Sequence, residues 1–110
     1  MRAQLELTRL SEYTDGWNGP RSLGADPVSF HLASRFVCLL RDSKGLRISP
    51  TIFAVGTAAL EITKAPFKLL IEFTRPGELA VNIDTPSGPL DYDIVGFDGT
   101  KIPEELRRFL

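Results

Sequence analysis

Residues 67–83 have the sequence FKLLIEFTRPGELAVNI, which is the clearest β-hairpin signal in the chain. Apolar residues occupy every second position on both sides of a central turn, and this period of two is typical of a strand with one buried face. The turn contains Pro76 and Gly77, where proline presets φ and glycine supplies a positive φ. The pattern therefore predicts two antiparallel strands joined by a tight turn.

The period of two continues on both sides of this hairpin. Residues 48–55 are rich in β-formers but contain Pro50, which favours an edge strand or a bulge. Residues 57–63 and 90–94 also alternate, and a turn is expected over 84–89. Residues 97–100 carry a further hairpin signal, Phe-Asp-Gly-Thr. We expect a meander of four to five antiparallel strands.

Before Gly45 the hydrophobic period is helical. Residues 2–14 are expected to form a short amphipathic helix. Asp26-Pro27 is a strong helix start, because Asp caps the free amides and Pro fits the first helical position. This second helix is expected to run to about residue 43 and to bury the stripe Val28, Leu32, Phe36 and Leu39. Trp17 lies in a glycine-rich loop and is expected to be mostly buried between the loop and the helices, its indole N–H bound to a carbonyl.

The order of elements predicts an α+β fold, with two N-terminal helices packed on one face of the sheet. We expect one domain over residues 1–110, comprising a helical part (1–45), a sheet part (46–102) and a terminal helical turn (103–110). The other face of the sheet is expected to meet water or a partner. Its polar residues are Glu61, Thr63, Lys68, Glu72, Asn82 and Asp84.

Composition narrows the functional class. The chain has 110 residues, of which 43% are hydrophobic, so disorder is excluded. The formal net charge of −1 argues against direct nucleic-acid binding. No apolar run approaches the ~20 residues that span a bilayer, and the charged N-terminal residues do not resemble a signal peptide. We therefore expect a cytoplasmic location and no membrane partner.

Catalytic chemistry finds little support in the residue inventory. The single histidine, His31, and the single cysteine, Cys38, are seven positions apart on one predicted helix, a rise of ~10.5 Å that is too long for a dyad. Asp91 and Asp93 are candidates for paired carboxylates, although an outer strand face in water is favoured. Asp98-Gly99 is interpreted as a turn. We expect no enzyme, and we assign no catalytic, metal-binding or cofactor-binding residue and no cofactor.

The charge distribution is the most informative feature. Residues 1–75 carry a net charge of +3, whereas residues 76–106 carry −6. A concentrated negative field attracts basic surfaces and accelerates their association. The alternative is that these charges prevent an exposed strand edge from aggregating. The predicted partner-binding residues are Asp84, Asp91, Asp93, Asp98, Glu104 and Glu105.

The order of motifs resembles a loose group of small uncharacterised bacterial and phage proteins, over roughly residues 5–83. The shared elements are the turn at residues 15–19 (Asp-Gly-Trp-Asn-Gly), the helix start at Asp26-Pro27, and a strand from Gly56 that contains Leu60-Glu61. Where that group commonly has an aromatic residue after the Leu-Glu pair, this chain has Ile62. The resemblance implies a mobile-element or defence-related setting and supplies no active site.

Three functions follow from these observations. The favoured hypothesis is a non-enzymatic interaction or inhibitor protein that binds a basic, nucleic-acid-handling protein through an acidic surface, such as an anti-defence (anti-CRISPR-like) or an antitoxin or immunity protein. The second is a small structural subunit that self-associates through its sheet, for instance as a homodimer. The third is a small hydrolase that uses Asp91 and Asp93.

Overall fold

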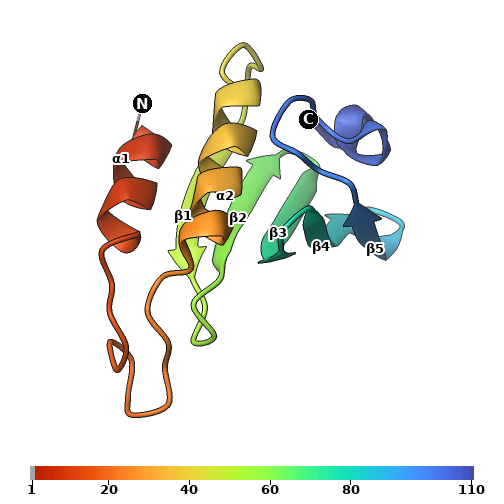
Figure 1. Cartoon of the computed structure of the whole chain (residues 1–110). Helices are drawn as coiled ribbons and strands as arrows, with labels where there is room; N and C mark the ends of the chain where they lie inside the picture. Colours follow the sequence, from red (N-terminus) through yellow and green to blue (C-terminus); the bar gives the residue numbers. More distant parts are fainter. Residues whose placement is uncertain (1) are drawn as a thin grey trace.

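The computed structural model describes residues 2–110 and has the predicted α+β architecture (Figure 1). Two helices precede a five-stranded sheet, and a 3₁₀ turn follows it. The bounds are α1 Arg2–Leu10, α2 Pro27–Leu39, β1 Arg47–Ile52, β2 Ala58–Lys64, β3 Phe67–Arg75, β4 Glu78–Thr85, β5 Gly88–Val95 and η1 Glu104–Phe109.

The sheet is an antiparallel meander with the strand order β1-β2-β3-β4-β5. The hairpin expected from residues 67–83 forms with Phe73 opposite Leu79 and Leu69 opposite Ile83. Pro50 lies on β1, an edge strand, as predicted. The hairpin expected at residues 97–100 is wrong. The chain turns away after β5, and within residues 2–110 no sixth strand follows.

Both helices lie on one face of the sheet, with α2 across β2 and β3 and α1 beside β1. The helix ends differ from expectation, since α1 stops at Leu10 and α2 at Leu39, each followed by turns. The buried stripe of α2 is centred on Ser29, Phe36 and Leu40. Val28 lies about 100° away from Ser29 on the helix and is 46% exposed, so its predicted burial is wrong.

Aromatic residues join the layers of the core. Phe36 of α2 meets Phe73 of β3 and Phe97 after β5, with ring centroids 5.8 and 5.5 Å away. Phe109 of η1 packs on Phe67 of β3 at 5.0 Å, so η1 covers the same face as the helices. Most of the surface of Trp17 is buried, as expected, and the side chain packs against the core.

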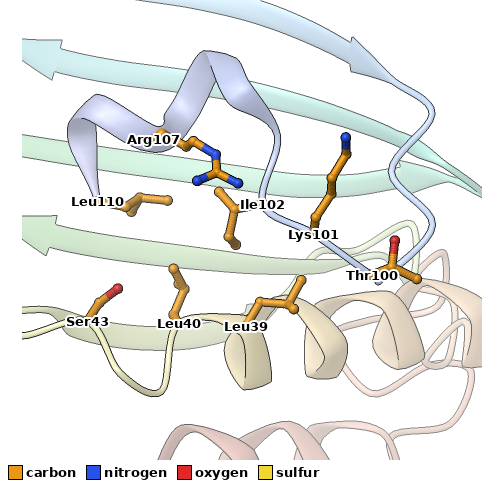
Figure 2. Close-up of a pocket in the computed structure, with 8 residues that line it drawn as sticks. All are labelled: Leu39, Leu40, Ser43, Thr100, Lys101, Ile102, Arg107 and Leu110. Carbon is orange, nitrogen blue, oxygen red and sulfur yellow. The ribbon is translucent and has the colours of Figure 1, made fainter.

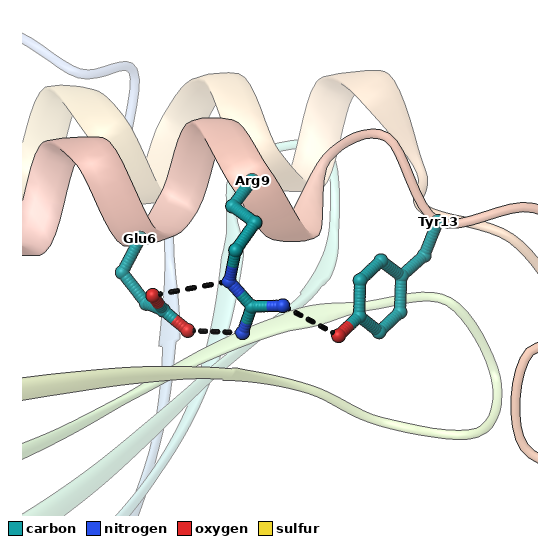
Figure 3. Close-up of polar contacts among 3 residues, drawn as sticks. All are labelled: Glu6, Arg9 and Tyr13. Carbon is teal, nitrogen blue, oxygen red and sulfur yellow. Dashed lines mark hydrogen bonds and ion pairs between the residues drawn. The ribbon is translucent and has the colours of Figure 1, made fainter.

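Residues 11–26, between α1 and α2, form a loop that we call the entry loop, and it holds Trp17 by a polar contact and an aromatic one. The indole Nε1 donates to the carbonyl of Leu23 at 2.7 Å, which confirms the expected bond. The ring lies against Tyr13, with centroids 5.3 Å apart. Tyr13 in turn accepts a hydrogen bond from Arg9 at 2.8 Å, and Arg9 also pairs with Glu6 on α1 (Figure 3). The loop aromatics are therefore anchored to α1 and pack against the core.

Candidate functional site

The sheet has one covered face and one open face. Alternate strand residues such as Leu60, Ile71 and Val81 are buried beneath the helices. The residues between them point away from the helices, because successive side chains in a strand alternate in direction. We call this second set the open face. It includes Arg47, Ser49, Thr51, Ala59, Glu61, Thr63, Lys68, Leu70, Glu72, Ala80, Asn82, Asp84, Asp91 and Asp93.

Three of the six predicted acidic residues lie together on this open face. Asp91 and Asp93 occupy alternate positions of β5, opposite Asn82 and Ala80 of β4, and Asp84 lies two residues beyond Asn82. All three carboxylates are exposed. The side-chain amide of Asn82 donates to Asp91 Oδ1 at 2.7 Å, so one carboxylate is held in a fixed direction.

Two further carboxylates join them from β2 and β3. Glu72 is in the same cross-strand row as Ala80 and Asp93, and its Oε2 accepts a hydrogen bond from Thr57 at 2.7 Å. Glu61 forms an ion pair of 3.2 Å with Lys68. The alternation of polar and apolar residues in the sequence predicted that Glu61 and Glu72 lie on the polar face of the sheet. Only the strand register shows that Glu72 lies in the same cross-strand row as Asp93.

Three of these carboxylates, those of Glu72, Asp91 and Asp93, line a shallow hollow on the open face, which we call the acidic hollow. Its volume is about 310 Å³. Ala80 leaves room between the longer side chains of neighbouring rows. The lining residues are Phe53, Leu70, Glu72, Ala80, Val81, Asn82, Asp91, Tyr92 and Asp93. The hollow thus combines three carboxylates with apolar walls, a combination suited to the aliphatic stem and charged end of Arg or Lys.

The other three predicted residues lie elsewhere. Asp98 is in the loop after β5, where Gly99 packs against Arg35 of α2. Glu104 and Glu105 lie on η1, which covers the helix side because it buries Leu106 and Phe109. The structure therefore divides the six residues into three on the open face and three away from it. Burial of the apolar side of η1 is the physical reason.

Local partners already engage two of these outlying carboxylates. Glu104 pairs with Arg107 at 3.0 Å. Asp98 accepts hydrogen bonds from the hydroxyl and the amide of Thr100, which hold the pKa of this carboxyl below its ordinary value. Asp98 and Glu104 therefore interact with residues close to them in the sequence. On the open face, the carboxylates of Asp84 and Asp93 are exposed.

A second hollow, of about 410 Å³, lies between the end of α2 and η1 (Figure 2). Its walls combine apolar residues, with Leu39 and Leu40 on one side and Ile102 and Leu110 on the other, and polar ones such as Ser43 and Thr100. Arg107 and Lys101 lie at its rim, and Arg107 is engaged by Glu104. Nothing in the sequence pattern indicated this hollow, because its two sides are about 60 residues apart.

His31 and Cys38 are both exposed on α2. Cys38 Sγ accepts a hydrogen bond from Gln4 of α1 at 3.2 Å, and Gln4 also contacts Ser34. Within residues 2–110, no group of three or more His, Cys, Asp or Glu side chains is arranged to hold a metal ion. Over the same residues, no helix has both the length and the apolar character needed to cross a membrane.

A scan of family models and searches of curated proteins and of solved structures give no match to this chain.

Proposed function

We propose that this chain is a non-enzymatic binding protein that takes a basic protein surface on the open face of its sheet. The supporting observation is that five strands are covered by helices on one face only, while the other face carries six carboxylates and three cations. The carboxylates are Glu61, Glu72, Glu78, Asp84, Asp91 and Asp93, and the cations are Arg47, Lys68 and Arg75. Arg75 pairs with Glu78 at 3.9 Å. Lys68 is already engaged by Glu61.

The chemistry of the open face favours a nucleic-acid-handling partner. Proteins that bind nucleic acid carry basic grooves that meet a row of phosphates. On the open face Asp91 and Asp93 lie two residues apart on β5, about 6.8 Å, and Glu72 lies in the same cross-strand row as Asp93, so the face presents a cluster of negative charges to such a groove. Occupying such a groove would exclude nucleic acid from it, and this is the action of an inhibitor, an anti-defence protein or an antitoxin. The resemblance to small bacterial and phage proteins agrees with that role.

The two other functions receive less support. Face-to-face self-association would oppose the carboxylates of one copy to those of another, which is unfavourable. A hydrolase using Asp91 and Asp93 would need a site that excludes water. Both carboxylates are exposed, and the acidic hollow that they line is shallow and open.

The test is capture of partners from a bacterial lysate by the wild-type chain and two charge-reversal variants. D91K/D93K reverses two carboxylates on the open face. E104K/E105K makes the same change in net charge on η1 and serves as the matched control. We expect wild type and the control to retain the same basic partner and D91K/D93K to lose it.

Kinetics of association with the captured protein refine this test. The association rate of D91K/D93K should fall at least tenfold at low salt, and its salt dependence should flatten, because steering acts over a Debye length of ~8 Å at physiological ionic strength. Equal losses in both variants would show that only net charge matters and would contradict a binding role for the open face.

A further inference from the structure

The strand β5 lies at one edge of the sheet. Within the part of the chain that the structure describes, β5 pairs with β4 alone, and no strand lies on its other side. Its exposed residues include Pro89, Asp91, Asp93 and Val95, the last of them 77% exposed. A bare strand edge presents unpaired N–H and C=O groups that can template another strand.

The register fixes which backbone groups point outward. Gly96 donates its amide proton to the carbonyl of Gly77 at 2.8 Å, next to the pair Val95–Glu78. Pairs along an antiparallel ladder alternate between bonded and non-bonded, so Ile94, Tyr92 and Leu90 bond to β4. The N–H and C=O groups of Asp91, Asp93 and Val95 therefore point away from β4.

The row of outward-pointing N–H groups on this edge ends at a proline. By the same alternation, Pro89 occupies an outward position and has no N–H to offer. The free outward amides therefore belong to Asp91, Asp93 and Val95. The first two carry side chains on the open face, so an incoming strand would meet backbone groups and carboxylates at the same positions.

The opposite edge of the sheet is protected. Phe53 donates its amide proton to Thr57 O at 2.9 Å, which sets the alternation of β1 against β2. Ile48, Pro50 and Ile52 consequently point outward from β1, and Pro50 interrupts their N–H row. Helix α1 also lies beside β1. The two edges therefore differ, and β5 is the one with three consecutive outward amides.

We propose that β5 accepts an extended basic segment of the partner as a sixth strand of the sheet. This inference rests on the proposed function and specifies how the partner is held. Residues that lie opposite each other share a face, so every second residue of the segment should be Lys or Arg, facing Asp91 and Asp93. The residues between them would lie beside Leu90 and Tyr92, which are half-buried, and small or apolar side chains fit there.

Charge argues against a second copy of this chain as the sixth strand. Two β5 strands paired antiparallel about Tyr92 would put Asp91 of one copy opposite Asp93 of the other. Like charges directly opposite each other are destabilising in a ladder. A basic strand converts the same positions into favourable pairs, so the occupant that complements this edge is basic.

The probe is a synthetic heptapeptide, TKTKTKT, with blocked termini, added to the full chain at low salt. NMR hydrogen exchange of the amides of Asp91, Asp93 and Val95 reports strand addition. Two N-methylated peptides are compared, one methylated at the lysines and one at the central threonines. Only one set of peptide amides can face β5, so we expect the two affinities to differ at least tenfold and the three amides to exchange at least tenfold more slowly with the tighter peptide.

A variant pair of the protein gives a second measurement. Asp93→Pro and Asp93→Asn remove the same charge, but only the proline removes an outward N–H. We expect Asp93→Pro to bind the unmethylated peptide at least fivefold more weakly than Asp93→Asn does. If Asp93→Pro fails to fold, the methylated peptides alone decide the question.

The outcomes separate this proposal from the broader function. Equal affinities of the two methylated peptides, with binding still weakened in D91K/D93K, would overturn strand addition and leave the acidic face as the binding surface. Equal affinities together with unchanged binding in D91K/D93K would overturn both. Unequal affinities with slowed exchange at Asp91, Asp93 and Val95 would establish strand addition.

Discussion

The hydroxyl oxygen of Ser29 lies 2.8 Å from the backbone nitrogen of Ala58 and takes the place of a backbone pairing that is absent between β2 and β3. The last pair between β2 and β3 is Ala59 with Glu72, so Ala58 and Phe73 would form the next one. Ser29 accepts the amide proton of Ala58 and donates its own proton to Phe73 O at 2.7 Å. A helix side chain thus joins two strands where they separate, and it fixes α2 on the sheet.

Ser29→Ala should therefore destabilise the fold markedly. The variant leaves a buried N–H and a buried C=O without partners, and each costs about 1–3 kcal/mol. We expect the free energy of unfolding to fall by about 2–4 kcal/mol, measured by urea denaturation. Ser49→Ala, at an exposed position of β1, is the control and should change stability by less than ~0.5 kcal/mol. A loss of similar size in both variants would contradict the bridging role.

Gly56→Ala should be more damaging than Gly45→Ala. Both glycines have positive φ, +90° and +76°, so both variants strain the backbone by about 1–2 kcal/mol. Only at Gly56 would the new Cβ clash with another backbone atom, the carbonyl oxygen of Gly24. Thermal unfolding of the two variants isolates the cost of that contact. Equal melting temperatures would show that the entry loop shifts to accommodate the new Cβ without a cost in stability, and would contradict this prediction.

Trp17→Ala should cost less than truncation of a core aromatic residue. Trp17 keeps part of its surface exposed and forms one hydrogen bond, whereas Phe36 is fully buried. We expect a loss of about 1–3 kcal/mol for Trp17→Ala and about 3–5 kcal/mol for Phe36→Ala, compared by urea denaturation. If Trp17→Ala instead left stability intact and abolished capture of the partner, Trp17 would belong to the binding surface.

Asp98 should titrate below the ordinary range of an aspartate. The hydroxyl and amide of Thr100 donate to its carboxylate and lower its pKa. Because the folded-state pKa is depressed, the stabilisation exists above the unfolded pKa and is lost as the pH falls through the folded pKa. Thr100→Val removes the hydroxyl, so the pKa of Asp98 should move up toward its ordinary value in a carbon-detected NMR titration. An unchanged pKa of Asp98 in Thr100→Val would contradict the role of this hydroxyl.

Local patterns in the sequence predicted most of the architecture. Alternation placed the strands, Asp26-Pro27 placed the start of α2, and the proline of β1 marked an edge. The failures have physical causes that lie beyond local pattern. Val28 is exposed because Ser29, a polar residue, occupies the buried stripe to bridge two strands. The hairpin expected at residues 97–100 does not form, and Phe97 instead packs in the core against Phe36 and Phe73.

The candidate site was predicted only in part for a similar reason. Asp84, Asp91 and Asp93 follow from the period of their own strands. Glu72 joins them through register across β4, which alternation within one strand does not specify. Asp98 and Glu104 leave the group because η1 folds back over the helix side, and that path depends on tertiary burial of Leu106 and Phe109.

The unequal edges of the sheet also limit how large any assembly can become. A filament that grows by strand pairing requires both edges of the sheet in every copy to be able to pair with another strand. Here Pro50 and α1 block the β1 edge. A strand that pairs with β5 therefore cannot be followed by a second pairing at the other edge. If β5 accepts a partner strand as we propose, the expected stoichiometry is one partner segment to one chain, in a finite complex and not a fibre.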